Sequence, residues 1–392
     1  MKSSGVDIDT RDNVQNTSLD ADAEYIRTAG FSMVGDGGGA LYRRAISEPV
    51  HAGKIQSADG AWWELAEALP LITMFGAIAD GITDVTSNWQ DALNYLKLMG
   101  TGEGGAIGVP SNGKKYRVRG GLVAPVGCKV EIYGIGYPQV FFDPPAVDIT
   151  THFLNVGAAE YSGFINVIRN ISIWGNGTSG GRCINGEFLS NLKLYDVFMY
   201  NFVGWCVYAK DCYCFSFEGG QCVGNTDGTS EGGIFMSRGT GNQGLVSHVR
   251  INDFNGVDKT GITLAGNTTD THYGLRIENC AFESNYNGIY CQSARGITID
   301  TCYFELNTST NITINGTGDT VHSVSVLNNA FFEAGNTGCT YINCDGLWIA
   351  GNSFQYNANC YIEDTAGRYQ LGINTFTNGS FLFSGTTPRK NY

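Results

Sequence analysis

A repeated pattern between residue 274 and about residue 378 constrains the fold more than any other feature of this sequence. Four copies follow one another, at 274–283, 296–305, 324–333 and 346–355, and a fainter copy ends near residue 377. Measured on Phe282, Phe304, Phe332 and Phe354, the steps are 22, 28 and 22 residues. A self-similar period of about 20 to 30 residues indicates a stack of structural repeats.

Each copy begins with apolar residues at alternate positions, which is the periodicity of a β-strand. The alternating pairs are Leu275 and Ile277, Ile297 and Ile299, Val324 and Val326, and Leu347 and Ile349. One coil cannot bury its apolar face, but coils stacked about 4.8 Å apart share a core and pair their backbones. We therefore predict an all-β fold, a parallel β-helix over residues 105–383, with the four phenylalanines in one interior column. It should be right-handed, because parallel crossovers prefer that hand.

Composition and charge exclude two classes of protein. With 54 glycines, 8 prolines and 16% charged residues in 392, the chain suits a turn-rich β fold better than a disordered one. A net charge of −13 argues against nucleic-acid binding, which requires clustered Lys and Arg to displace counterions.

The longest apolar run, 65–79, is interrupted by Glu67 and Pro70, so we expect no membrane insertion. The first residues lack the apolar segment of a secretion signal.

The N-terminal region differs from the repeats. Residues 1–23 are polar and without periodicity, which predicts a flexible or partner-ordered arm. Short strands are expected on both sides of the glycine-rich segment 35–39, which we interpret as a tight turn. A phosphate-binding loop would continue into Gly-Lys-Ser/Thr and a helix, and this segment does not. Residues 57–65 suggest a second hairpin with Trp62 and Trp63 at its apolar end.

One amphipathic helix is expected before the first coil. Ser87 and Gln90 fit a capping box, and Trp89, Leu93 and Leu96 fall on one helical face before a stop at Gly100. This helix could plug the open end of the stack. The alternative is a helix packed against the side of the coils.

Three segments resemble a known group of proteins. Residues 35–42, Gly-Asp-Gly-Gly-Gly-Ala-Leu-Tyr, and 57–64, Ser-Ala-Asp-Gly-Ala-Trp-Trp-Glu, resemble the N-terminal module of phage and prophage tailspike proteins. Residues 75–84, Phe-Gly-Ala-Ile-Ala-Asp-Gly-Ile-Thr-Asp, resemble the opening motif of the pectate-lyase-like superfamily, which includes many phage depolymerases. Val85 stands where that family usually has a further Asp, which puts a ligand role at this position in doubt.

The resemblance implies an organisation and a location. We expect an arm at 1–23, a virion-attachment module at 24–70, a linker and capping helix at 71–104, the β-helix at 105–383 and a tail at 384–392. The protein would belong to a virion, as a tail or neck appendage assembled in the bacterial cytoplasm. Its partners would be host surface polysaccharide and, through residues 1–70, other virion proteins.

Glutamates that follow the repeated phenylalanines are the first catalytic candidates. Alternation turns Glu283, Glu305 and Glu333 outward onto one face, about 5 Å apart on adjacent coils. Retaining glycosidases hold two carboxyls about 5–5.5 Å apart and inverting ones about 6.5–9.5 Å apart. The ladder therefore spans both geometries. The alternative is a structural role, in which each Glu hydrogen-bonds the next coil.

A second acidic pair is not repeated, which favours function over scaffold. Glu278 and Asp300 point outward from the longer strand, while later copies carry Leu327 and Ala350 at the matching positions. Arg276 shares this outward face and could orient a carboxylate or bind an acidic substrate group.

Two reaction classes and one structural role stay open. Hydrolysis would use a carboxylate pair, whereas a lyase would need a base and a cation, for which Arg276, Arg295, His272 and Lys259 are available. The acidic chain would repel an anionic substrate at long range, which slightly favours hydrolysis. The first hypothesis is a depolymerase of host polysaccharide, and the alternative is a non-catalytic spike or collar appendage. We expect no cofactor and no metal, since the histidines and cysteines lack ligand spacing.

Twelve cysteines raise the question of disulfides. Cys280 and Cys302 hold the same coil position one repeat apart, within disulfide range. Reduced, buried thiols are the expectation for a protein assembled in a cytoplasm. Cys212 and Cys214 should share one face of a strand.

A homotrimer is the expected assembly. A lone β-helix ending near residue 383 would expose its last coil and an apolar flank, and three-fold symmetry would cover the flank without propagating. The small module at 35–65 would then bury Trp62 and Trp63 against sister chains or the particle.

Overall fold

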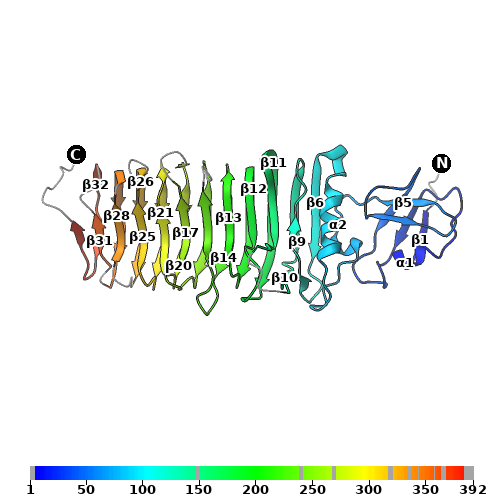
Figure 1. Cartoon of the computed structure of the whole chain (residues 1–392), viewed down its shortest axis with the longest axis horizontal. Coiled ribbons are helices and arrows are strands. Elements are labelled where there is room, and N and C mark those ends of the chain that lie inside the picture. The colour runs from blue at the N-terminus through cyan, green and yellow to red at the C-terminus, as the bar shows by residue number, and fades with distance from the viewer. Residues whose placement is uncertain are drawn as a thin grey trace.

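The chain is a long stack of parallel coils with a small separate sheet at its N-terminal end (Figure 1). The computed structural model describes residues 5–145, 150–237, 242–266, 271–316, 321–332, 337–342, 344–356, 358–362 and 368–383. The predicted parallel β-helix is confirmed, and it begins with β6 (Gly104–Pro110). The proposed tail at 384–392 lies outside the described residues.

Each coil contributes strands to three faces. The first face contains β8 (Leu122–Val123), β13 (Trp205–Cys212), β15 (Gly232–Ser237), β17 (Thr260–Ala265), β21 (Asn287–Cys291), β25 (Thr310–Asn315), β28 (Thr337–Ile342), β31 (Cys360–Ile362) and β34 (Phe381–Phe383). The second face contains β6, β9 (Lys129–Ile135), β19 (Arg276–Glu278), β23 (Thr298–Asp300), β26 (Val321–Leu327), β29 (Cys344–Ala350) and β32 (Tyr369–Leu371). The third face contains β7 (Tyr116–Val118), β10 (Gln139–Phe142), β20 (Ala281–Glu283), β24 (Tyr303–Glu305), β27 (Ala330–Phe332), β30 (Ser353–Phe354) and β33 (Thr375–Phe376).

Longer strands bend from one face to the next. β11 (Leu154–Gly175) and β12 (Ile184–Tyr200) pass over all three faces, while β14 (Ser216–Val223) and β16 (Leu245–Asn252) cover the second and third. Two short strands, β18 (His272–Tyr273) and β22 (Ala294–Arg295), form the corner that leads into the second face. Neighbouring coils pair in parallel along every face.

A column of stacked phenylalanine rings fills the interior of the C-terminal coils. Its members are Phe282, Phe304, Phe331, Phe354 and Phe376, with ring centroids 4.9, 4.9, 4.6 and 4.7 Å apart. The expectation of Phe332 in this column is wrong. Phe331 pairs with Phe304 and points inward, so alternation turns Phe332 outward beside Glu305.

The same interior column continues through the N-terminal coils with other residue types. In register with the phenylalanines lie Ile251, Cys222, Met199, Ile173 and Val140, all fully buried. These coils therefore share one architecture with the C-terminal ones although their sequences do not repeat.

Buried asparagines close one corner of the C-terminal coils. Asn329, Asn352 and Asn374 occupy one file, in which each side-chain oxygen accepts from the preceding residue of the file, as in Asn329 N to Asn352 Oδ1 at 2.9 Å. Each side-chain amide donates to a backbone carbonyl of the previous coil. Cys280 and Cys302 take the same place in earlier coils, and their thiols reach the equivalent carbonyls at 3.5 and 3.6 Å. A thiol thus replaces the amide as the corner donor.

Five strands form the N-terminal module, in the order β1 (Gly5–Ile8), β2 (Tyr25–Thr28), β3 (Leu41–Ala45), β5 (Trp62–Leu65) and β4 (Lys54–Gln56). β1 pairs in parallel with β2, and α1 (Arg11–Val14) follows it. Residues 5–14 are therefore ordered by contacts within the chain, which differs from the flexible or partner-ordered arm expected over residues 1–23. Sequence periodicity could not indicate this strand, because only four residues pair.

The two neighbouring tryptophans of β5 have opposite environments. Trp63 is fully buried inside the module, and its indole N–H donates to Ser57 Oγ at 2.9 Å. Trp62 faces outward beneath the ammonium group of Lys54, 5.4 Å from its ring centroid. The expectation that both rings are buried against sister chains or the particle is wrong for Trp63, because alternation along β5 points this ring into the core of its own module.

Between the module and the coils lie two short 3₁₀ helices, η1 (Ile72–Phe75) and η2 (Met99–Gly102), and the helix α2 (Thr86–Leu96). The expected capping box is wrong, because α2 begins at Thr86 and places Ser87 inside its first turn. Asp84 Oδ1 instead accepts from the Thr86 amide at 3.0 Å. Val85 is fully buried, which suits a packing role at this position.

Helix α2 lies beside β6 at the N-terminal end of the stack (Figure 1). Trp89 packs edge-on against Tyr116 and Phe153, with ring centroids 6.4 and 5.8 Å away. The Gln90 side chain donates to the carbonyl of Val123 and accepts from its amide, which satisfies the outer edge of β8. That contact fits a cap on the open end, and the capping role stays a prediction.

All twelve cysteines are free thiols, and eleven of them are buried. Cys212 is buried at the end of β13, whereas Cys214 is exposed. The expectation that both share one face is wrong, because the chain turns between them and Cys214 adopts a φ of 44°.

Among the described residues, no helix is long and apolar enough to span a membrane.

Candidate functional site

The second face brings together two acids and one arginine that the sequence singled out. β19 and β23 are adjacent parallel strands whose register places Glu278 beside Asp300. The guanidinium of Arg276 lies 2.6 Å from Glu278 Oε2 and 3.9 Å from Asp300 Oδ2. Alternation points Arg276 and Glu278 outward on either side of the buried Ile277, and it points Asp300 outward next to the buried Ile299. One cation therefore bridges two carboxylates on successive coils.

Asp300 receives hydrogen bonds from two further groups. Its Oδ1 accepts from the hydroxyl of Thr301 at 2.9 Å and from the side-chain amide of Asn328 at 3.1 Å. Leu327 and Ala350 continue the same outward file on the next coils, as expected from the sequence. The acidic pair is thus confined to two coils.

An exposed tryptophan lies on the same face. Ser325 and Trp348 follow Arg276 and Thr298 in one outward file, one residue for each coil. The Trp348 side chain is 46% exposed, which is unusual for so large an apolar group. The second face therefore combines carboxylates, a cation and a flat apolar ring.

The third face carries the other acidic pair. Glu283 and Glu305 are register neighbours on β20 and β24, and Arg250 Nη2 lies 2.7 Å from Glu283 Oε2. Burial raises the pKa of Tyr303 to about 12, and the adjacent Glu305 and Glu283 add to the shift. The Tyr303 phenol therefore keeps its proton at neutral pH.

The expected ladder of three glutamates is wrong. Phe332 occupies the outward position after Glu305, so the file of acids ends there. Glu333 itself lies outside the described residues. The cause is the pair of consecutive phenylalanines, which lets the sequence be aligned one position out of register.

Two of the residues offered as the base or cation of a lyase lie elsewhere. His272 is fully buried inside the corner, and its Nε2 lies 2.9 Å from the carbonyl of Ala265, so its expected role at the surface is wrong. Lys259 precedes β17 on the first face, away from the acidic pair. Arg295 is exposed at the corner that leads into the second face.

An aromatic file on the third face was missed by the sequence analysis. Phe141, Trp174 and Tyr200 point outward on successive coils, and the rings of Trp174 and Tyr200 stack with centroids 4.1 Å apart. Lys115 Nζ lies 4.8 Å from the Trp174 ring centroid. Alternation with the buried Val140, Ile173 and Met199 is the signal that could have revealed this file.

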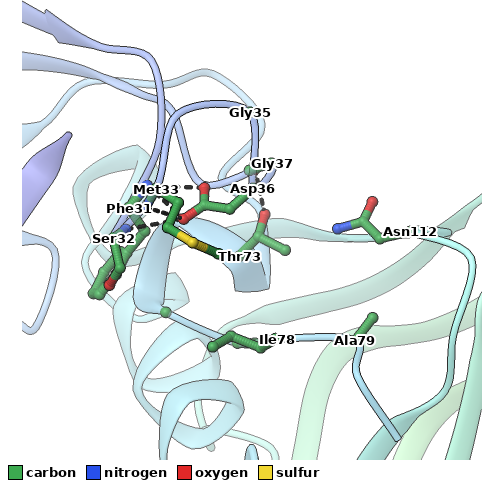
Figure 2. Close-up of a pocket in the computed structure, with 12 residues that line it drawn as sticks. Phe31, Ser32, Met33, Gly35, Asp36, Gly37, Thr73, Ile78, Ala79 and Asn112 are labelled. Carbon is green, nitrogen blue, oxygen red and sulfur yellow. Dashed lines mark hydrogen bonds between the residues drawn. The ribbon is translucent and has the colours of Figure 1, made fainter. Parts of the chain in front are cut away.

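A cavity of about 470 Å³ lies at the junction of the N-terminal module and the first coil (Figure 2). The turn at residues 31–37 forms one side and Asn112 lies on the other. The carboxylate of Asp36 accepts from the amides of Phe31, Ser32, Met33 and Gly38. Its charge is therefore used to hold the turn, and the remaining lining is mainly apolar.

No group of three or more His, Cys, Asp or Glu side chains suited to a metal ion occurs within the part of the chain that the structure describes. No family model and no curated protein matches the sequence. Comparison therefore depends on solved structures.

Several solved structures share the fold. The tailspike protein of Acinetobacter baumannii phage AM24 matches with a TM-score of 0.68 and 15% identity, over 95% of this chain and 65% of that protein. PfbA, a surface adhesin of Streptococcus pneumoniae, matches with a TM-score of 0.57 and 12% identity, over 80% and 91% of the two chains.

A further match is tailspike protein gp49 from Acinetobacter baumannii bacteriophage Fri1, a capsular polysaccharide depolymerase. It has a TM-score of 0.51 and 15% identity, over 96% of this chain and 75% of that protein. At such identities the likeness establishes the fold alone. This chain has the parallel β-helix fold seen in phage tailspike proteins.

Proposed function

We propose that this protein is a virion-associated, tailspike-like protein that binds host surface polysaccharide and depolymerises it on the second face. The observation that carries the proposal is the unrepeated pair Glu278 and Asp300, held by Arg276 on adjacent coils. Fold likeness to phage tailspikes supports the biological setting.

Hydrolysis is the reaction that this pair suits best. Adjacent strands lie about 4.8 Å apart, close to the carboxyl separation of about 5–5.5 Å in retaining glycosidases. Thr301 and Asn328 donate hydrogen bonds to Asp300, which stabilise an ionised carboxylate and suit it to act as nucleophile. Glu278, the second carboxyl of the pair, would have to take up a proton and give it to the leaving oxygen, against the ion pair with Arg276 that favours its ionised form.

Trp348 would position the polysaccharide. A sugar ring presents flat patches of C–H groups, which pack on an aromatic face, while its hydroxyls stay in water. An exposed tryptophan offers a large and rigid surface for such contact. It lies two coils beyond the acidic pair, about 10 Å along the stack.

The assay that tests the activity uses polysaccharides purified from bacterial hosts. Hydrolysis releases new reducing ends without ultraviolet absorbance, whereas elimination at a uronate leaves an absorbing double bond. Glu278→Gln and Asp300→Asn should each lower the rate at least about a hundredfold, the usual contribution of a general acid or nucleophile. Glu187→Gln is a matched control, since Glu187 lies on the first face and pairs with Lys210.

The same variants separate rival sites and roles. If Glu283→Gln and Glu305→Gln remove the activity and the second-face variants do not, the active site lies on the third face. If no host polysaccharide is cut but binding persists, the protein is the non-catalytic appendage that the sequence also allowed.

Attachment and assembly belong to the same proposal. We expect a homotrimer bound to the particle through residues 1–70, with outward groups such as Trp62 available for contact. Light scattering at micromolar concentration should give three times the 42.2 kDa chain mass, and a monomer mass would refute the trimer. Deletion of residues 1–70 should leave the β-helix folded but prevent incorporation into particles.

A further inference from the structure

Short strands at the corner before the second face align three side chains that the proposed hydrolysis does not use. β22 lies between β18 and the start of β26, so Tyr273, Arg295 and His322 follow one another on successive coils. Arg295 is exposed, Tyr273 is 46% exposed and the His322 side chain is 30% exposed. We name this file the corner file.

The charge of Arg295 sets it apart from its neighbours. Four arginines occur among the described residues from 242 to 383, and three of them, Arg250, Arg276 and Arg368, contact a carboxylate. The Arg295 side chain has no hydrogen bond, ion pair or ring contact with any described residue. An acidic chain thus leaves a guanidinium available at this corner.

The residue beside Arg295 does not neutralise it. His322 carries no negative charge that could pair with the Arg295 guanidinium. The next member of the file is Asp345, which His322 approaches to 4.0 Å. Arg368 holds that carboxylate at 2.9 Å and lowers the pKa of Asp345 to about 2. The Asp345 carboxylate is therefore paired with Arg368 and not with Arg295.

We infer that the corner file binds an anionic group of the polysaccharide, a carboxylate or a phosphate, with Arg295 as the main contact. The inference rests on the function proposed above. A guanidinium presents parallel N–H donors that match two oxygens of one anion. Tyr273 and His322 lie on either side of it, and the phenol of Tyr273 can supply a further hydrogen bond.

The location of the corner file suits the same glycan chain. Arg276 follows Tyr273 by three residues on its own coil, and Thr298 follows Arg295 in the same way. A polysaccharide lying across the second face would reach Arg295 with one residue and the Glu278 and Asp300 pair with the next ones.

Such a site is compatible with a chain of net charge −13. Charges on the exposed surface are screened beyond a distance of about 8 Å at physiological salt. The corner file therefore recognises an anion at contact, without attracting the glycan from a distance. Binding should weaken in high salt for the same reason.

An array of purified bacterial polysaccharides, probed with the full-length protein, tests this inference. The array should hold carboxylate-bearing glycans, their carboxyl-reduced and otherwise identical forms, phosphate-bearing glycans and neutral glycans. Arg295→Ala should weaken binding of the anionic class about tenfold to a hundredfold, as expected for the loss of a charged hydrogen bond. Arg295→Lys should restore part of it, because a lysine keeps the charge but lacks the fork.

The control is Arg43→Ala, which removes the same charge from the N-terminal sheet and should leave glycan binding unchanged. Loss of the carboxylate class alone, or of the phosphate class alone, identifies which anion is recognised. Equal binding by wild type and Arg295→Ala overturns the corner site but keeps the proposed function. If the wild-type protein binds only neutral glycans, the anionic substrate class is overturned. If the wild-type protein binds no glycan on the array, the proposed function is overturned as well.

Discussion

The N-terminal and C-terminal coils of the β-helix have one architecture but differ in what repeats. In the C-terminal coils the interior column is phenylalanine in every turn, from Phe282 to Phe376. In the N-terminal coils the same column holds valine, isoleucine, methionine and cysteine. A core position requires apolar volume more than identity. Visible sequence repetition therefore marks only part of the stack.

The outward residues also differ between the N-terminal and the C-terminal coils. One outward file of the third face holds the stacked rings of Trp174 and Tyr200 in the N-terminal coils, whereas the same file holds Glu283 and Glu305 further along the stack. These residues are not needed for stacking, so they are free to carry recognition and chemistry. The interior column is therefore uniform in the C-terminal coils and varied in the N-terminal coils.

The largest expected effect comes from breaking the ring column. Phe304 is fully buried between Phe282 and Phe331, so Phe304→Ala should lower the free energy of unfolding by about 3–5 kcal/mol. Cys222→Ala, at the equivalent N-terminal position, removes only one sulfur atom and should cost less. Denaturant titration of both variants measures the difference. Equal costs would show that the two halves are packed alike.

A smaller effect is expected in the file of asparagines formed by Asn329, Asn352 and Asn374. Asn352 donates to the Val326 carbonyl and accepts from the Asn329 amide, and it is almost fully buried. Asn352→Ala leaves these groups without partners, which should cost about 1–3 kcal/mol. Hydrogen exchange should then speed up at the Asn329 amide, while amides of the N-terminal coils keep their protection. Loss of protection throughout the stack would contradict the expectation that Asn352 stabilises only the coils next to it.

The cysteine corners sharpen the comparison further. If the Cys302 thiol replaces an asparagine amide, Cys302→Asn should be nearly neutral, whereas Cys302→Ala loses the donor to the Ile277 carbonyl. Burial raises the pKa of the Cys302 thiol, so it stays protonated and able to donate. Alkylation of the unfolded protein without reductant should label both Cys280 and Cys302. A cross-linked pair would refute the thiol as corner donor.

The smallest effects concern acid stability. Hydrogen bonds from Thr83 and from the Ile82 amide lower the pKa of Asp80 to about 2, below its ordinary value of about 3.9 in an unfolded chain. Its contribution is therefore complete above about pH 4 and is lost as the pH falls to about 2. Asp80→Asn should flatten the decline of the unfolding temperature over this range. Asp345→Asn provides the same test in the C-terminal coils.

Local patterns were sufficient to predict the fold. Alternating apolar residues and a 22-residue step indicated parallel coils, and the placement of Phe282, Phe304 and Phe354 inside is confirmed. The third copy failed because Phe331 and Phe332 are adjacent. Counting two positions from the corner residue, as from Cys302 to Phe304 or from Asn352 to Phe354, would have selected Phe331.

The candidate site was predictable only where strands were long enough to fix the direction of side chains. Glu278, Asp300 and Arg276 lie together as expected from alternation. His272 lies in a strand of two residues after a loop, and no periodicity there determines whether a side chain points inward. The third-face aromatics belong to coils whose sequences do not repeat, so no alignment could place them in one file.

The stacking of coils has a consequence for how such a chain can change in length. Each coil meets only the coil before it and the coil after it, so a whole period could be gained or lost while every other contact is kept. A duplication of 22 residues between Asp300 and Trp348 would move these two groups apart by one strand spacing, about 4.8 Å. The number of coils would then set the distance between these two groups. Under the proposed function, that number would determine which sugars of one glycan chain can contact both groups.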